Sequence, residues 1–319
     1  MFFCGIDIAK HQHAALVLDD GGQVVQPAFS LDNSRPGFDK LAAALTELSE
    51  PVSIGLEATG HCWLALYADL TQQGNAVPVI NPLQVAAYRR SGIRKTKTDS
   101  TDAFWIADFL RIANLQPTDQ DLPVILQLRE LSRFRFWLTD QIGDCKRKDL
   151  CILDRVFPEY ETLFSSVFLK SSRALLKEGV SAQEIADFDL AELADLLRNA
   201  SRGRFGQPKA EAIQNAARQS VGVGFLVDAV RVQMHCLLKQ IDLLQQQVAQ
   251  LDEALAELME QIPQYITSIP GIGPATGAAI LGESGDIHRF ESVDKLVAYA
   301  GIDPTVYQTG QFEASQAHM

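Results

Sequence analysis

Four carboxylates in the first third of the sequence have the types and spacing for metal-dependent chemistry. Asp7 lies in GIDIAK and Glu57 in GLEATG, each where a predicted strand ends, and Asp99 and Asp102 lie three residues apart in KTDSTDA. A spacing of three places two side chains on one face of a helix. Carboxylate oxygens suit Mg²⁺, and clusters of them hold the metal ions of phosphoryl-transfer enzymes. We therefore expect the four to bind Mg²⁺ if the strands are neighbours and the helix packs across their ends.

A run of basic residues directly precedes the aspartate pair. The segment RRSGIRKTK contains five cations and no acid: Arg89, Arg90, Arg94, Lys95 and Lys97. Beside a metal cluster, such a run is suited to hold a nucleic-acid backbone, whereas a charge run taken alone is usually a solvated loop. The carboxylates also have structural explanations, as a helix cap for Asp99, an ion pair for Asp102 and turn residues for the other two. Their joint placement favours the functional interpretation.

A glycine-rich segment near the end of the chain is a second candidate for contact with nucleic acid. In IPGIGPATGAAIL, Gly271 and Gly273 form a predicted turn that leads into a helix of small residues. The hairpins of helix-hairpin-helix modules have this pattern, and their backbone amides contact phosphates. A plain structural turn is the alternative. The six histidines show no metal-ligand spacing that nearby cysteines support, and we expect His11 and His13 to be an exposed pair without a role.

The elements that must position these residues follow a recognisable order. Residues 2–6, 13–18 and 23–31 are short, rich in Val, Leu and Phe and separated by turns, which predicts a meander of three strands. Predicted helices and strands then alternate: helix 35–48, strand 52–56, helix 63–73, strand 76–80, a helix after Pro82 and another from Asp99. This order is that of the ribonuclease H-like fold, an α/β fold with a mixed sheet. The actin-like ATPase fold begins in the same way.

The second half of the chain is predicted to be helical. Residues 123–157 form one long helix, in which we expect Phe134, Phe136 and Trp137 to belong to the core, and FPEY ends it. Residues from about 158 to 220 resemble an insertion. From Val230, apolar residues recur at alternating intervals of four and three over four heptads, which predicts a coiled coil. It could pair with 123–157 or with another subunit, and we expect it to contribute to self-association as a dimer or tetramer.

The composition and the charge of the chain limit the classes of function that it can have. The chain has 319 residues with a net charge of −12, which argues against nonspecific coating of nucleic acid, yet residues 85–177 hold 16 of the 28 basic residues and only 12 of the 40 acidic ones. Five cysteines without CxxC spacing argue against a disulfide framework or a zinc knuckle. No apolar stretch of about 18 residues and no signal-peptide core is present. We expect a cytoplasmic protein without a membrane partner.

Several short motifs of the sequence resemble those of a known family. GIDIAK, GLEATG, VINP, KTDSTDA, the FPE ending of a long helix, SIPGIGPATGAAIL and YAGIDPTVYQTGQF stand in the order found in DEDD insertion-sequence transposases, which are related to the pilin-gene-inverting recombinase and of which some are guided by a bridge RNA. The resemblance covers essentially the whole chain. It implies a RuvC-like catalytic domain at 1–118, a helical coiled-coil region at 119–262 and a mostly helical transposase domain with a helix-hairpin-helix-like motif at 263–319.

The resemblance also implies roles for individual residues. The acidic tetrad of the family falls on Asp7, Glu57, Asp99 and Asp102, which would bind Mg²⁺. Family members use a serine nucleophile in a YxSG segment, and here Thr309 stands at the serine position. Its hydroxyl is retained, but the added methyl group hinders attack. Ser315 is a substitute with weaker support. Family members also continue with a basic helical segment beyond the position of Met319, so we expect the last domain to be incomplete.

These observations predict a DNA transposase or site-specific recombinase. DNA would be its substrate, a structured guide RNA a partner and a hydroxyl its nucleophile. Three alternatives remain open. A tetrad-only nuclease resembling a junction resolvase would cleave with activated water, an actin-like ATPase would need a second glycine-rich phosphate loop, and a scaffold derived from a transposase would bind nucleic acid without chemistry.

Overall fold

A computed structural model describes residues 1–58, 60–90, 99–113, 115, 122–302, 308–309 and 312–313. For Asp99, Leu122 and the four residues at 308–309 and 312–313, it describes the course of the backbone. The chain divides into two compact units, Met1–Leu122 and Pro123–Met319, which we call unit 1 and unit 2. No helix of the described segments is long and apolar enough to cross a lipid bilayer.

Unit 1 is built on a mixed sheet of five strands. These are β1 (Phe2–Asp7), β2 (Gln12–Leu18), β3 (Val24–Asp32), β4 (Val52–Glu57) and β5 (Val79–Ile80), in the spatial order β3-β2-β1-β4-β5. The first three pair antiparallel, while β1–β4 and β4–β5 pair parallel. The predicted meander and alternating order are confirmed. The last strand is shorter than the predicted 76–80, because Pro78 has no amide hydrogen to donate to the ladder.

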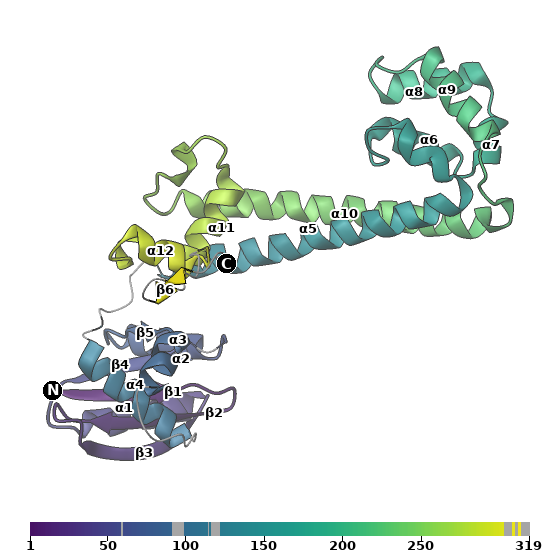
Figure 1. Cartoon of the computed structure of the whole chain (residues 1–319). Coiled ribbons are helices and arrows are strands. Elements are labelled where there is room, and N and C mark those ends of the chain that lie inside the picture. Colours follow the sequence, from purple (N-terminus) through teal and green to yellow (C-terminus); the bar gives the residue numbers. More distant parts are fainter. Residues whose placement is uncertain are drawn as a thin grey trace. The chain divides into compact units, whose positions relative to one another are not determined.

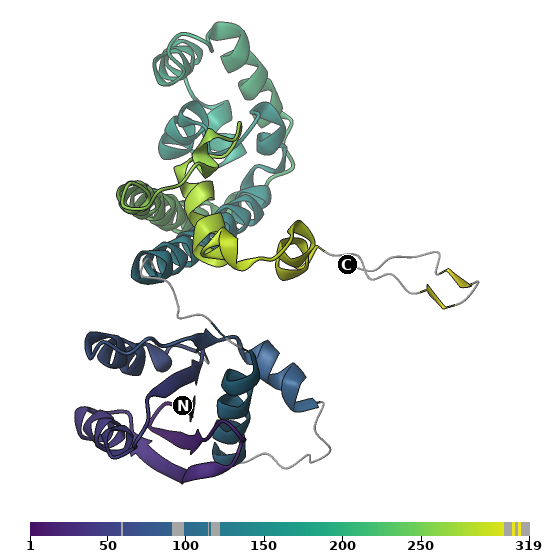
Figure 2. The ribbon, with the colours of Figure 1, turned by 90° about the vertical axis from the view of Figure 1, so that its left-hand side faces the viewer.

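Helices cover both faces of this sheet. Figure 2 shows α1 (Arg35–Thr46) and α2 (Trp63–Gln72) on one face and α3 (Pro82–Arg90) and α4 (Asp99–Ala113) on the other. Apolar side chains alternate along the strands, so that Leu16 and Leu18 of β2 pack against Ala103 and Ala107 of α4. The result is an α/β unit of three layers in which α4 lies directly on the central strand.

Two long helices form the body of unit 2. In Figure 1, α5 (Leu122–Val156) and α10 (Val227–Met259) lie side by side. Their contacts run in opposite directions along the two helices, since Leu128 packs with Leu255 while Ile142 packs with Ile241. Arg135 of α5 also pairs with Asp252 of α10 at 2.5 Å. The heptad residues of α10 are therefore buried or half-buried against α5 of the same chain, which is one of the two pairings that the sequence left open.

Smaller helices occupy both ends of this pair (Figure 1). One end carries α6 (Lys170–Glu178), α7 (Ala182–Ala186), α8 (Leu190–Ala200) and α9 (Gln207–Arg218), whose core continues into both long helices. This is the segment that the sequence suggested as an insertion. The other end carries α11 (Pro274–Ser284) and α12 (Val293–Tyr299), followed by the short strands β6 (Gln308–Thr309) and β7 (Phe312–Glu313).

The aromatic residues of α5 do not belong to the core, so that expectation is wrong. Phe134, Phe136 and Trp137 are 50%, 70% and 52% exposed, and the rings of Phe134 and Trp137 stack at 5.5 Å between centroids. The buried side of α5 is formed instead by Leu128, Leu138 and Ile142. Helical periodicity places the aromatic residues beside or opposite that stripe, where neither α10 nor α11 covers them.

Candidate functional site

Asp7 and Glu57 end two neighbouring strands of unit 1. The parallel register joins Ile6 to Leu56, so the next residue on each strand is the carboxylate at its carboxyl end. Both side chains are half-buried. Because the carboxyl ends of parallel strands meet at one edge of a sheet, the two residues occupy adjacent positions at that edge. The sequence placed both residues at strand ends and expected them to meet if the two strands were neighbours, and β1 and β4 are neighbours.

The start of α4 lies toward the same edge of the sheet. At its other end, Arg111 donates a 3.3 Å hydrogen bond to the carbonyl oxygen of Asp20, in the turn between β2 and β3. That turn follows Leu18, which pairs with Phe3 at the far end of β1 from Asp7. Since α4 runs across β1 between these points, its first turn, with Asp99 and Asp102, points toward the Asp7 end.

A glycine permits α4 to approach β1 this closely. A methyl group added to Gly5 would lie 2.8 Å from the Cα of Ala107 and closer still to backbone atoms of Ala103 and Ala107. Real Cβ atoms do not approach other atoms so closely, so only glycine fits at this crossing. The residue that precedes Ala103 is Asp102. The helix contact at Gly5 thus determines how far Asp102 stands from the sheet.

Asp102 is paired with one of the predicted phosphate-binding residues. The Nη1 atom of Arg89 lies 2.7 Å from the Oδ1 atom of Asp102, and their side chains are 34% and 16% exposed. The neighbouring Tyr88 hydroxyl donates a 2.6 Å hydrogen bond to Asp108 of α4. Burial, followed by the hydrogen bond to Asp108, raises the pKa of Tyr88 to about 12. Two polar links therefore hold the end of α3 against α4.

The donor types at this edge fit a divalent cation. Carboxylates at two strand ends and at the start of a helix are hard oxygen ligands. Asp102 already forms an ion pair with the guanidinium of Arg89. Among the side chains that the structure describes, no three histidines, cysteines or carboxylates stand close enough together to hold a metal ion. The side chain of Asp99 lies outside the described residues. The arrangement thus brings two tetrad members to one edge and directs the helix of the other two toward it.

His13 lies beside this edge and was misjudged from the sequence. It is 1% exposed rather than exposed, and its Nδ1 accepts a 3.3 Å hydrogen bond from the amide of Ala9 in the turn that follows Asp7. Burial lowers the pKa of His13. Its ring packs at 6.4 Å from that of Phe38 in α1. The alternation of strand β2, which places residue 13 on the face covered by α1, was the signal that could have indicated this burial.

The basic run is described only in part. Arg89 and Arg90 end α3, where Arg90 is exposed. Cations in the last turn of a helix interact favourably with the negative end of its dipole. Arg94, Lys95 and Lys97 lie outside the described residues. Their proposed contact with a nucleic-acid backbone therefore stays a prediction.

The glycine-rich turn of unit 2 precedes α11, as the sequence predicted. Gly271 has a φ of +91°, a backbone conformation that favours glycine, and Gly273 is the N-cap of α11. Both are exposed, and open space surrounds the position of a Cβ atom at either residue. The small residues that follow have a packing role, because a methyl group at Gly282 would lie 2.7 Å from the backbone nitrogen of Arg129 in α5.

The proposed nucleophile lies in the last described segment. The backbone of Thr309 belongs to β6 and pairs with Phe312 of β7. Tyr307, Gly310 and Ser315 lie outside the described residues. The structure therefore describes the backbone of Thr309, in a short antiparallel strand pair.

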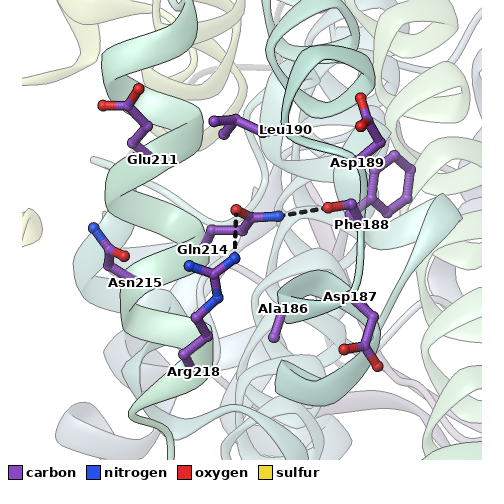
Figure 3. A pocket seen from close by; sticks show the side chains of 9 residues that line it. All are labelled: Ala186, Asp187, Phe188, Asp189, Leu190, Glu211, Gln214, Asn215 and Arg218. Atoms are coloured by element: carbon purple, nitrogen blue, oxygen red, sulfur yellow. Dashed lines mark hydrogen bonds between the residues drawn. The ribbon is translucent and has the colours of Figure 1, made fainter.

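A polar pocket in unit 2 belongs to the α6–α9 helices. It has a volume of about 600 Å³ and is lined by nine residues, among them Gln214 and Arg218 of α9. Figure 3 shows the chain of hydrogen bonds within it: Arg218 donates to Gln214, whose amide nitrogen donates to the carbonyl oxygen of Phe188. These bonds tie α9 to the loop between α7 and α8. The pocket contains none of the residues that the sequence singled out.

Comparisons with known proteins agree with the motifs. Residues 4–158 match a family model of DEDD type for IS110, described as a transposase, and residues 263–319 match one described as the transposase IS116/IS110/IS902 family. A protein of Streptomyces coelicolor whose name describes it as a mini-circle transposase for IS117 is 28% identical to this chain. The similarity covers 97% of this chain and 78% of the relative's own length.

Two other similar proteins come from insertion elements. An uncharacterized 44.8 kDa protein of IS116 from Streptomyces clavuligerus is 24% identical over 96% of this chain and 77% of its own length. An uncharacterized 42 kDa protein of IS900 from Mycobacterium paratuberculosis is 26% identical over 98% of this chain and 79% of its own length. The similarity therefore extends through both units.

Proposed function

Because this chain belongs to the IS110 family of insertion-sequence transposases, which act on DNA, we propose that it is a site-specific recombinase that cleaves and exchanges DNA strands with the help of Mg²⁺. In this proposal, unit 1 is a ribonuclease H-like catalytic domain. The observation that carries the proposal is the position of Asp7 and Glu57 at adjacent strand ends, with the start of α4 directed toward them.

The residues of unit 1 would hold and orient the scissile phosphate. Asp7, Glu57, Asp99 and Asp102 would bind Mg²⁺. When bound between such carboxylates, Mg²⁺ neutralises the charge that develops on the phosphate oxygens. The cations of RRSGIRKTK would contact the nucleic-acid backbone. In unit 2, the backbone amides around Gly271 and Gly273 would make further contacts with it.

The attacking group in this proposal is the hydroxyl of Thr309. Its Oγ1 would bond to phosphorus, one phosphodiester oxygen would leave with a proton, and the protein would remain covalently attached to one DNA end until the strands are exchanged. The methyl group on Cβ, the carbon that bears the attacking oxygen, slows this step relative to serine. A structured RNA encoded beside the gene would select the DNA sites, and self-association would bring two DNA sites together.

The experiment uses the full chain and a supercoiled plasmid that carries the DNA flanking its gene. Wild type with Mg²⁺ is expected to give a protein–DNA adduct that survives denaturing gel electrophoresis. Thr309→Ala should abolish the adduct, Thr309→Ser should increase it, and Asp7→Asn should abolish both cleavage and adduct. Ser315→Ala tests the substitute nucleophile: the adduct should persist in this variant if Thr309 attacks and disappear if Ser315 does.

Two outcomes would contradict parts of the proposal. Cleavage that persists in Thr309→Ala, without any adduct in wild type, would identify a nuclease that uses water. Sequencing of the co-purified nucleic acid tests the guide: a discrete RNA from the DNA beside the gene supports it, and the absence of a specific RNA contradicts it.

A further inference from the structure

We propose that Arg89 competes with the divalent cation for Asp102, neutralising this carboxylate before the cation binds and leaving it when the cation arrives. The inference rests on the proposed function, because it assumes that Asp102 belongs to the metal-binding tetrad. It adds a positioning residue to that site. Arg89 would first hold the apo site together and then become available to a phosphate oxygen.

The ion pair has the geometry for this competition. Arg89 Nη1 lies 2.7 Å from Asp102 Oδ1, and Asp102 is 16% exposed, so water can replace little of what the guanidinium provides. A carboxylate that is largely removed from water needs a cation or hydrogen-bond donors. A guanidinium and a divalent cation on one carboxylate would repel each other, since like charges a few ångströms apart interact strongly outside bulk water. One occupant therefore disfavours the other.

The fold delivers Arg89, rather than its neighbour, to Asp102. The ring of Tyr88 packs against Trp105 at 5.6 Å and against Phe109 at 5.5 Å, both on α4, and its hydroxyl is bonded to Asp108. This anchor holds the end of α3 in place, so the adjacent Arg89 reaches Asp102 while Arg90 is exposed. These contacts of Tyr88 do not involve Asp102. Arg89 therefore stays beside the site after the cation has displaced it from Asp102.

The test measures cation binding to the full chain without nucleic acid. The protein is titrated with Mn²⁺ at pH 7.5, and free Mn²⁺ is followed by electron paramagnetic resonance. Displacement of bound Mn²⁺ by Mg²⁺ then gives the dissociation constant for Mg²⁺. Arg89→Gln is expected to lower the dissociation constant by about fivefold or more, because the competing charge is gone. Arg90→Gln is the matched control: it removes the same charge one residue away and should change the constant by less than about twofold.

A double-mutant cycle assigns the effect to this pair. Asp102→Asn should weaken cation binding, and in that background Arg89→Gln should cause no further gain. If Arg89→Gln still raises Mn²⁺ affinity in the Asp102→Asn background, the inference is overturned. It is also overturned if Arg89→Gln and Arg90→Gln bind Mn²⁺ equally well although wild type binds Mn²⁺ through Asp102. Failure of wild type to bind any divalent cation would overturn the proposed tetrad itself, and the inference with it.

A second measurement on the wild-type chain does not depend on folding of the glutamine variant. With arginine labelled at its side-chain nitrogens, the Arg89 signal is assigned as the one lost in Arg89→Lys. Saturating Mg²⁺ should shift this signal and end its restricted rotation, while the Arg111 signal, from the pair with Asp108, stays in place. An unchanged Arg89 signal at saturation would contradict displacement.

Discussion

Asp149, on α5, is a buried carboxylate outside the proposed site. It is 1% exposed, and neither of its oxygens has a hydrogen-bond partner among the described residues. The nearby cation Arg173 is committed to Asp242 through two 2.6 Å contacts. Burial raises the pKa of Asp149 from 3.8 to about 7, an effect that Arg173 only partly opposes. A neutral Asp149 therefore suits the folded state.

This residue makes the stability of unit 2 depend on pH. Above pH 3.8 the unfolded chain releases the proton of Asp149 while the folded chain keeps it up to about pH 7, so stability falls across this interval and then levels off. We expect Asp149→Asn to remove that loss, so that its free energy of unfolding relative to wild type increases by on the order of 2 kcal/mol between pH 5 and pH 7.

Urea unfolding followed by circular dichroism at several pH values measures this change. Asp154→Asn is the control, because Asp154 is exposed on the same helix. A difference between Asp149→Asn and wild type that does not vary with pH would show that Asp149 is ionised in the folded protein.

At the scale of single elements, α4 is the helix on which the proposed site depends. Gly5→Ala would insert a methyl group where Ala107 Cα is 2.8 Å away, so α4 must shift and carry Asp102 with it. We expect unit 1 to lose about 1–3 kcal/mol of stability, as overpacked cores do, and cation affinity to fall. Thermal unfolding and Mn²⁺ titration measure both effects.

Gly21→Ala is the matched substitution in the same unit. Gly21 is exposed in the turn between β2 and β3, and the nearest atom to its added methyl would be Asp19 Oδ1 at 3.3 Å. It should leave cation affinity unchanged. A Gly5→Ala protein with wild-type stability and affinity would mean that α4 does not pack on β1 as described.

At the scale of the whole molecule, the two units have separate cores. The core of unit 1 lies between the sheet and its helices, whereas unit 2 is held together along α5 and α10. We expect calorimetry to resolve two unfolding transitions. Mg²⁺ at about 100 times its dissociation constant should stabilise unit 1 by about 2.7 kcal/mol and leave the other transition in place. The Asp149→Asn substitution should shift the other transition alone, and a single transition moved by both would contradict this division.

Local patterns in the sequence were sufficient for the elements. Short runs rich in Val, Leu and Phe between turns predicted β1 to β3, and the heptad spacing of apolar residues predicted α10. The predicted order of strands and helices placed Asp7 and Glu57 at strand ends. These features depend on residues that are close together in the chain, where the periods of strands and helices act directly. The family resemblance came from the same short motifs, and the family models confirm it.

Contacts between distant residues were decided only by the tertiary structure. No local pattern says that α10 packs on α5 of its own chain, that Arg89 pairs with Asp102, or that Asp149 is buried while Trp137 is exposed. Each depends on which surface another element covers, and that surface comes from residues tens of positions away. Burial and pairing are sums over such contacts, so a single sequence states which side chains can meet, and the packed structure determines which of them do.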